Sequence, residues 1–185
     1  MIDRSQLIEL LAKRSAKRGQ FTLASGKQSD FYIDARLTTM SPEGLSLIGS
    51  IGLSTLRAAR WDVDAIGGLT LGADPIAYAI SYASSESDHP LRAFTVRKDS
   101  KGHGTKKLIE GPLQEGDRVA IIEDVITTGD SALRAIAAVR SANSVVVGVL
   151  ALVDREEGGR QAVESAGIEV ISLATAQQLR AAITD

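Results

Sequence analysis

The sequence contains no cysteine. Disulfide bonds, thiolate nucleophiles and cysteine-ligated metal centres are therefore excluded. The chain also lacks an excess of positive or negative charge, because its 21 basic and 23 acidic residues leave a net charge of only −2. This balance gives no reason to expect nucleic acid or an anionic membrane surface as a partner.

Long hydrophobic runs are absent as well. The longest apolar stretch, Val145 to Val153, is much shorter than a membrane-spanning helix. The first residues, Met1 to Arg4, lack the charged and then apolar order of a secretory signal. We therefore expect a cytoplasmic protein without membrane partners.

The chain has 185 residues, of which 44% are hydrophobic, and this is enough for one domain with a sizeable core. It also has 17 glycines. Many of these glycines fall at expected loop positions, which suggests ligand sites built from backbone groups.

Short apolar segments alternate with amphipathic segments from residue 63 onward. Apolar runs bounded by turn residues are typical of buried strands, and apolar residues at 3–4 spacing are typical of helices. The alternation predicts an α/β fold with a doubly wound, mostly parallel sheet. We expect strands at 21–23, 31–34, 63–66, 91–96, 119–122, 144–153 and 168–172, and helices at 7–14, 42–60, 74–84, 155–166 and from 131 onward. Loops after the parallel strands should meet at one rim, where ligands bind.

The most informative of these loops follows the apolar strand 119–122. Glu123 and Asp124 come directly after the strand, and hydroxyl residues and glycine then lead into a helix. The free backbone N–H groups at such a helix start attract anions. Two acids beside an anion site suit a ligand that also carries hydroxyl groups or brings a divalent cation, as a sugar phosphate with Mg²⁺ would. The alternative is an ordinary strand-to-helix turn with a capping side chain.

Two further loops belong to the same rim. The segment 67–74 again joins a strand to a helix through glycines and could hold a second phosphate-like group. Taken alone, a glycine-rich turn capped by Asp74 is the favoured interpretation, and the presence of two such loops on neighbouring strands is what supports the phosphate site. The segment 97–107 has five lysines and arginines against one acid and no apolar residue until Leu108. Mobile cationic loops often close over anions as lids, but a solvated charged hairpin is the alternative.

Together these motifs resemble the orotate phosphoribosyltransferase family, within the type I phosphoribosyltransferases. The strand, two acids, three residues and Thr128-Gly129 match the motif that binds phosphoribosyl diphosphate (PRPP) in that class. Arg97-Lys98-x-x-Lys101-x-His103-Gly104 resembles the family's catalytic loop, and 21–34 resembles its N-terminal hood. Asp154-Arg155 stands where the family places the arginine that meets the base.

The resemblance implies one domain over 1–185, with a core of approximately 41–170 and a hood of approximately 1–40 plus the C-terminal segment. It also implies roles for particular residues. Lys101, His103 and Asp124 would be catalytic. PRPP would contact Arg97, Lys98, Lys101, His103, Glu123, Asp124, Val125, Ile126, Thr127, Thr128, Gly129, Asp130 and Ser131. The diphosphate loop would be Leu71, Gly72, Ala73 and Asp74, and orotate would contact Tyr32, Thr127 and Arg155.

The implied activity is transfer of the phosphoribosyl group of PRPP to orotate. Mg²⁺ would be held by PRPP itself, with Asp124 bound through water and no direct side-chain ligand. A homodimer is expected, in which the lid 97–109 is shared across the interface. Alternatives are a purine or other nucleobase phosphoribosyltransferase and a PRPP-sensing regulator without catalysis.

Two positions depart from the family pattern. Ala24 stands where many members have a lysine, and Leu71-Gly72 replaces a Tyr-Lys pair that some members use on the diphosphate. More of the diphosphate charge should therefore fall on backbone donors, Mg²⁺ and the lid.

Overall fold

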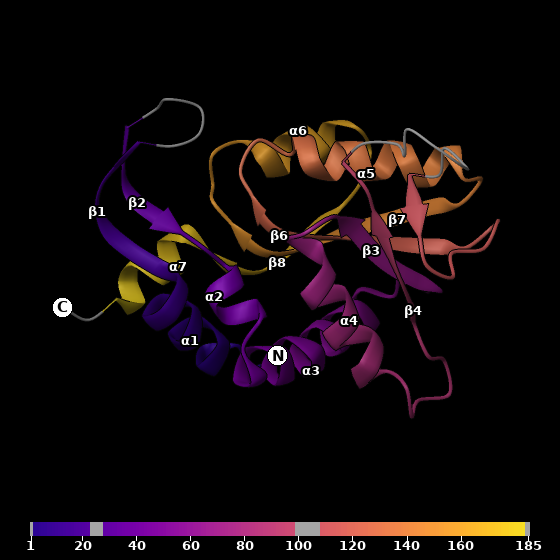
Figure 1. The fold of residues 1–185 in the computed structure, drawn as a ribbon, viewed down its shortest axis with the longest axis horizontal. Coiled ribbons are helices and arrows are strands. Elements are labelled where there is room, and N and C mark those ends of the chain that lie inside the picture. The colour runs from indigo at the N-terminus through magenta and orange to yellow at the C-terminus, as the bar shows by residue number, and fades with distance from the viewer. Residues whose placement is uncertain (1, 23–27, 99–107, 184–185) are drawn as a thin grey trace.

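Figure 1 shows the computed structural model of the chain, which describes residues 2–22, 28–98 and 108–183. A sheet with helices on both faces forms the larger part. A hairpin and three helices form a smaller part beside it, at the left of the view. None of the described helices combines the length and hydrophobicity needed to cross a lipid bilayer.

The sheet has six strands in the order β5-β4-β3-β6-β7-β8. All neighbours pair in parallel except β5, which runs antiparallel to β4. The chain moves outward from β3 to β4 and then returns to place β6 on the other side of β3. The expected doubly wound, mostly parallel sheet is confirmed. The strands are β3 (Ala65–Leu69), β4 (Arg92–Val96), β5 (Ile109–Glu110), β6 (Arg118–Ile126), β7 (Val145–Asp154) and β8 (Val170–Thr175).

Helices cover the two faces of the sheet and create two hydrophobic cores. Helices α3 (Pro42–Ala59) and α4 (Ala73–Ala83) lie on one face, and α5 (Asp130–Ser141) and α6 (Gly159–Ser165) lie on the other (Figure 1). Strand β6 contributes side chains to both cores. Ala120 and Ile122 face α3 and α4, whereas Val119 and Ile121 face α5. A strand that is buried on both sides requires the unbroken apolar run found here.

The smaller part, which we call the hood, combines both ends of the chain. Its strands pair antiparallel, and its last helix lies against its first. Arg180 pairs with Asp30 at 2.7 Å and stacks over the Phe31 ring at 4.3 Å, which ties the C-terminal helix to the hairpin. The hood elements are α1 (Ser5–Ser15), β1 (Ala16–Thr22), β2 (Gln28–Ile33), α2 (Arg36–Thr39) and α7 (Ala176–Ala182).

Several element boundaries differ from the expected ones. Strand β6 continues through Glu123 and Asp124 to Ile126, because it keeps pairing with β7 up to Asp154. Helix α6 begins at Gly159 rather than at residue 155, since Gly158 adopts φ +99° and the residues before it form a turn. The short strand β5 and helix α7 had no clear hydrophobic pattern and were not predicted.

Candidate active site

The candidate site lies where the chain reverses its direction across the sheet, between β3 and β6. Ligands of open α/β sheets bind at the carboxyl ends of strands at such a point. The strand ends are aligned there, because Leu69 pairs with Val96 and Ile126 pairs with Asp154. A cavity of about 340 Å³ opens at this rim, between the sheet and the hood.

Many of the residues predicted for the site line this one cavity. They come from the hood, from the end of β6 and the loop after it, from the loop after β3, and from positions just after β4 and β7. They are Tyr32, Leu71, Gly72, Lys98, Glu123, Asp124, Val125, Thr127, Ser131 and Arg155.

Other predicted residues lie nearby but do not line the cavity. Arg97 lines a neighbouring cavity together with Lys98. Ile126, Ala73 and Asp74 are buried. Thr128, Gly129 and Asp130 form the turn into α5. Lys101 and His103 lie outside the described residues.

The loop after β6 has free amide groups. No backbone N–H of Thr127, Thr128 or Gly129 donates a hydrogen bond to another described residue. Gly129 adopts φ +86° at the start of α5, and a side chain there would press against the carbonyl oxygen of Gly159. This turn therefore requires glycine. It presents unpaired amides and the positive end of the α5 dipole, which is the arrangement that holds a phosphate.

Glu123 and Asp124 provide the acidic side of the cavity. Burial raises the pKa of Glu123 to about 9, and the charge of Asp124 and a hydrogen bond with it act in the same direction. Glu123 is therefore protonated near neutral pH, and the pair carries about one negative charge. Asp124 also accepts a hydrogen bond from the Val125 amide at 2.8 Å, which fixes its carboxylate. The oxygen atoms of both side chains can accept hydrogen bonds from the hydroxyl groups of a sugar.

The loop after β3 packs directly against Asp124. A Cβ added to Gly72 would overlap the Asp124 carboxylate, so the close approach depends on glycine at this position. The Thr70–Leu71 peptide bond in this loop is cis. The buried Asp74 carboxylate accepts hydrogen bonds from Thr70 at 2.6 Å and from Thr95 at 2.9 Å. Its side chain thus holds the loop to β4.

Arg155 brings a buried cation to the other end of the cavity. It follows β7 directly, and its amide donates to the Ile126 carbonyl at 3.0 Å. Its guanidinium pairs with Glu157 at 2.9 Å and reaches the Phe31 carbonyl of the hood at 3.4 Å. A planar guanidinium in such a position can bind a carboxylate through two parallel hydrogen bonds.

The structure also adds residues that sequence reasoning missed. Asp34, Arg36 and Thr70 line the cavity. Asp34 and Arg36 form an ion pair just after β2, at 2.8 Å. The Asp-x-Arg pattern directly after the hood strand was the available signal, but the resemblance brought only Tyr32 of the hood to the site.

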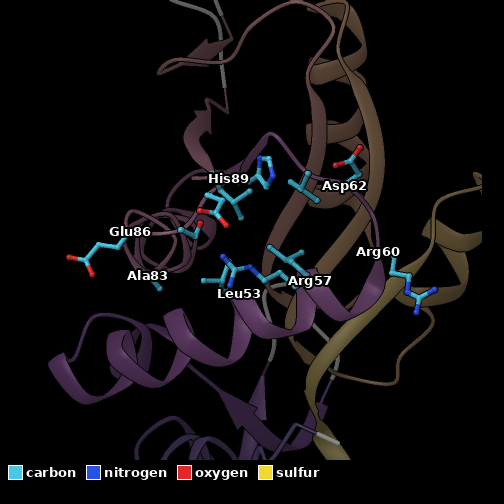
Figure 2. A pocket seen from close by; sticks show the side chains of 12 residues that line it. Leu53, Arg57, Arg60, Asp62, Ala83, Glu86 and His89 are labelled. Atoms are coloured by element: carbon cyan, nitrogen blue, oxygen red, sulfur yellow. The ribbon is translucent and has the colours of Figure 1, made fainter.

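A larger cavity of about 830 Å³ lies at the opposite edge of the sheet, before β3 and β4. Its lining combines the basic residues Arg57, Arg60 and His89 with the acids Asp62, Glu86 and Asp88. Figure 2 shows Arg60 and Glu86 at opposite ends of this cavity, with side chains that point outward. Its two arginines are outnumbered by three carboxylates, so it has no positive excess to attract an anion, and the smaller cavity at the rim is the better candidate for the active site.

The strand order, together with the loops after β3 and β6 at one rim, is that of the type I phosphoribosyltransferase fold. Comparison with solved structures agrees with this class. The adenine phosphoribosyltransferase of Leishmania tarentolae, at 16% identity and a TM-score of 0.67, has the same fold over 98% of this chain and 91% of its own. No protein-family model matches the chain.

Relatives define the family more narrowly. The orotate phosphoribosyltransferase of Aquifex aeolicus is 49% identical over 176 residues, which cover 94% of this chain and 95% of the relative. That of Nostoc is 44% identical over 96% of this chain and 85% of its own length. The crystal structure of the Mycobacterium tuberculosis enzyme in complex with PRPP is 40% identical, covers 97% of this chain and 99% of its own, and has a TM-score of 0.80. The chain belongs to the orotate phosphoribosyltransferase family.

Proposed function

We propose that this protein transfers the 5-phosphoribosyl group of PRPP to orotate, giving orotidine 5′-monophosphate and diphosphate for pyrimidine synthesis. The observation that carries the proposal is the placement of Arg155. It sets a buried guanidinium in the same cavity as the phosphate-binding loop Thr127–Ser131. A substrate with a phosphate at one end and a carboxylate-bearing base at the other would use both groups. A purine base has no carboxylate for Arg155, and a purine transferase is therefore the weaker alternative.

The residues of the cavity suit a displacement without a covalent enzyme intermediate. The anomeric carbon would pass through an oxocarbenium-like state while negative charge grows on the departing diphosphate. The loop 127–131 would hold the 5′-phosphate. Glu123 and Asp124 would accept hydrogen bonds from the hydroxyl groups of the ribose. Catalysis would consist mainly of positioning and charge stabilisation.

Mg²⁺ is proposed as the metal ion of the reaction. Within the described residues, no three His, Asp or Glu side chains form a metal-binding group. Asp124 with its neighbour Glu123 fits a cation that the substrate brings with it, since hard cations prefer oxygen ligands and retain waters. Asp124 would bind such an ion through water, and the ion would neutralise diphosphate charge.

The catalytic lid and the homodimer are also proposed. The Arg97 amide donates to the Leu108 carbonyl at 2.8 Å, and Lys98, the next residue along the chain, lines the cavity. The lid cations Lys101 and His103 would neutralise the leaving diphosphate, with Arg97 and Lys98 at the base of the lid. Exposed side chains along α4 and the loop before it support a subunit contact, because Tyr82 is 83% exposed and Tyr78 and Leu71 are more than half exposed.

The direct test is the loss of orotate ultraviolet absorbance after mixing the protein with PRPP and Mg²⁺. We expect turnover with orotate and none with adenine, guanine or hypoxanthine. Turnover with a purine base but not with orotate would show that the substrate is a purine. Binding of PRPP without turnover of any base would instead identify a sensor.

A further inference from the structure

Arg36 lines the same cavity as the loop after β3. It is the first residue of α2, only three positions after the end of β2. The cavity lining includes Arg36 together with Gly72 and Asp124. Asp34 raises the pKa of Arg36, and Asp124 adds to this effect from across the cavity, so the guanidinium stays charged. The hood thus adds a cation to the cavity that Gly72 and Asp124 also line, within reach of the Asp124 charge.

Asp34 fixes the orientation of this guanidinium. The Nε atom of Arg36 donates to Oδ1 of Asp34 at 2.8 Å, and Nη2 donates to Oδ2 at 3.0 Å. The Arg36 amide donates to Oδ1 of the same carboxylate at 3.1 Å. The pairing is side-on, and therefore the outer edge with Nη1 is left open. Within the described residues no group accepts from that edge, and 52% of the side chain is exposed.

The open edge matches what a phosphate group requires. A guanidinium offers parallel N–H groups in a fixed fork, and phosphate oxygens accept them in pairs. A guanidinium already held by a carboxylate also loses less side-chain entropy when a ligand arrives.

A diphosphate at this loop would need a nearby cation to balance its negative charge. Residues Leu71 and Gly72 supply backbone groups only, and Asp124 beside them is acidic. Arg155 is engaged with Glu157 and the Phe31 carbonyl toward the base end of the cavity. Of the cations that line the described cavity, this leaves Lys98 and Arg36 to face an anionic group at the loop.

We propose that Arg36 binds the diphosphate group of PRPP and that Asp34 positions it for this contact. The inference rests on the proposed function and assigns a new binding residue to the same site. It places part of the diphosphate recognition in the hood rather than only in the lid.

The experiment compares ligands that contain the diphosphate with ligands that lack it. In Arg36→Ala we expect the Kd for magnesium diphosphate and the KM for PRPP to rise roughly 10- to 100-fold. The Kd values for orotidine 5′-monophosphate and orotate should change less than about twofold, because a lost contact affects only its own ligand. Calorimetry measures the Kd values, and steady-state assays in both directions measure KM.

Conservative variants separate a binding role from a structural one. Arg36→Lys should keep part of the affinity for diphosphate, because it keeps the charge but loses the fork. Asp34→Asn should cause a smaller loss of diphosphate affinity, since the Oδ1 acceptor remains. Arg14→Ala is the matched control, because Arg14 forms a surface ion pair with Glu43 away from the cavity. This control should leave every ligand unaffected.

Three results would overturn the inference. Equal weakening of orotidine 5′-monophosphate and PRPP in Arg36→Ala would assign Arg36 to the ribose phosphate or to the fold. Unchanged diphosphate affinity in both Arg36→Ala and Arg36→Gln would show that Arg36 does not contact the diphosphate. A wild-type protein that neither binds PRPP nor consumes orotate would reject the proposed function as well, whereas an active wild type with unaffected Arg36 variants would reject the inference alone.

Discussion

Among the described residues, the pKa of Glu123 is far from its ordinary value, so its protonation differs between the folded and the unfolded chain. Its pKa is raised from an ordinary value of 4.5 to about 9, first by burial and then by Asp124. Between these values the folded state binds more protons than the unfolded state, so the free energy of unfolding decreases as pH rises. The stabilisation is complete below the unfolded pKa of 4.5 and is lost as pH approaches about 9.

The variant Glu123→Gln tests this dependence. It keeps the shape of the side chain and removes the titration. We expect the wild type to lose up to about 1.4 kcal/mol per pH unit relative to the variant as pH rises. Urea unfolding at a series of pH values measures the difference. Parallel pH profiles for the two proteins would mean that Glu123 is ionised in the folded state.

Arg155 is expected to act on the base and not on PRPP. Removing its guanidinium in Arg155→Ala should raise the KM for orotate roughly 10- to 100-fold, because a charged hydrogen-bond pair is lost. The Kd for PRPP should stay within about twofold, as expected for a site without a shared partner. Steady-state kinetics and calorimetry measure the two quantities. Equal damage to orotate and PRPP would contradict the assignment.

Residue roles could be predicted where one local motif contains both the chemistry and its position. Glu123, Asp124 and the loop after them form such a motif, and the structure brings them to one cavity with Arg155. Arg36 could not be predicted in this way. Its place at the rim depends on how the hood packs on the sheet, and no spacing within the sequence encodes that contact.

At the level of elements, the loop between β3 and α4 depends on its close approach to β6. Gly72 has helical dihedral angles, so alanine would fit its backbone but would collide with the Asp124 carboxylate. We expect Gly72→Ala to raise the KM for PRPP at least tenfold, since misplacing a binding loop by about 1 Å can cost on the order of 10²-fold. Kinetics with PRPP measures the effect.

Gly116→Ala provides the control for this element. Gly116 adopts φ +84° in a turn, with open space around the position of a Cβ. The substitution should lower stability by about 1 kcal/mol through backbone strain without changing the KM for PRPP. A normal KM in Gly72→Ala would show that the loop can shift without loss of binding.

The elements with strong hydrophobic patterns were predictable, and those defined by long-range pairing were not. Helix α3 begins at Pro42, as its Ser-Pro start indicated, and the Ser41 hydroxyl accepts from the Gly44 amide at 3.1 Å. The end of β6 was missed because acids normally terminate an apolar strand, whereas pairing with β7 continues the strand through them. Strand β5 consists of two residues and exists only through its pairing with β4.

At the level of the whole molecule, a shared lid predicts that two inactive variants can restore each other. Lys101→Ala alone should lower kcat by about 10²- to 10³-fold, as the loss of a preorganised cation does. Arg155→Ala should be nearly inactive at low orotate. After subunits of both variants are mixed and allowed to exchange, one site of each mixed dimer has an intact lid and an intact Arg155. We expect about a quarter of wild-type activity, from random pairing of subunits.

The assay is orotate consumption at low orotate, before and after the mixed proteins are unfolded and refolded together. Each variant treated alone is the control and should stay inactive. Activity that never rises above the sum of the two variants would place each lid over the site of its own subunit.

The two ends of the chain meet in the hood, and this has a consequence for how the protein matures during synthesis. The sheet from β3 to β8 is complete once residue 175 has been made. The Arg180 contacts to Asp30 and Phe31 become available only after that point. During synthesis the phosphate-binding loop would therefore be complete before the hood could settle over it. Substrate affinity would arise only once the segment that carries Arg180 can reach the hairpin.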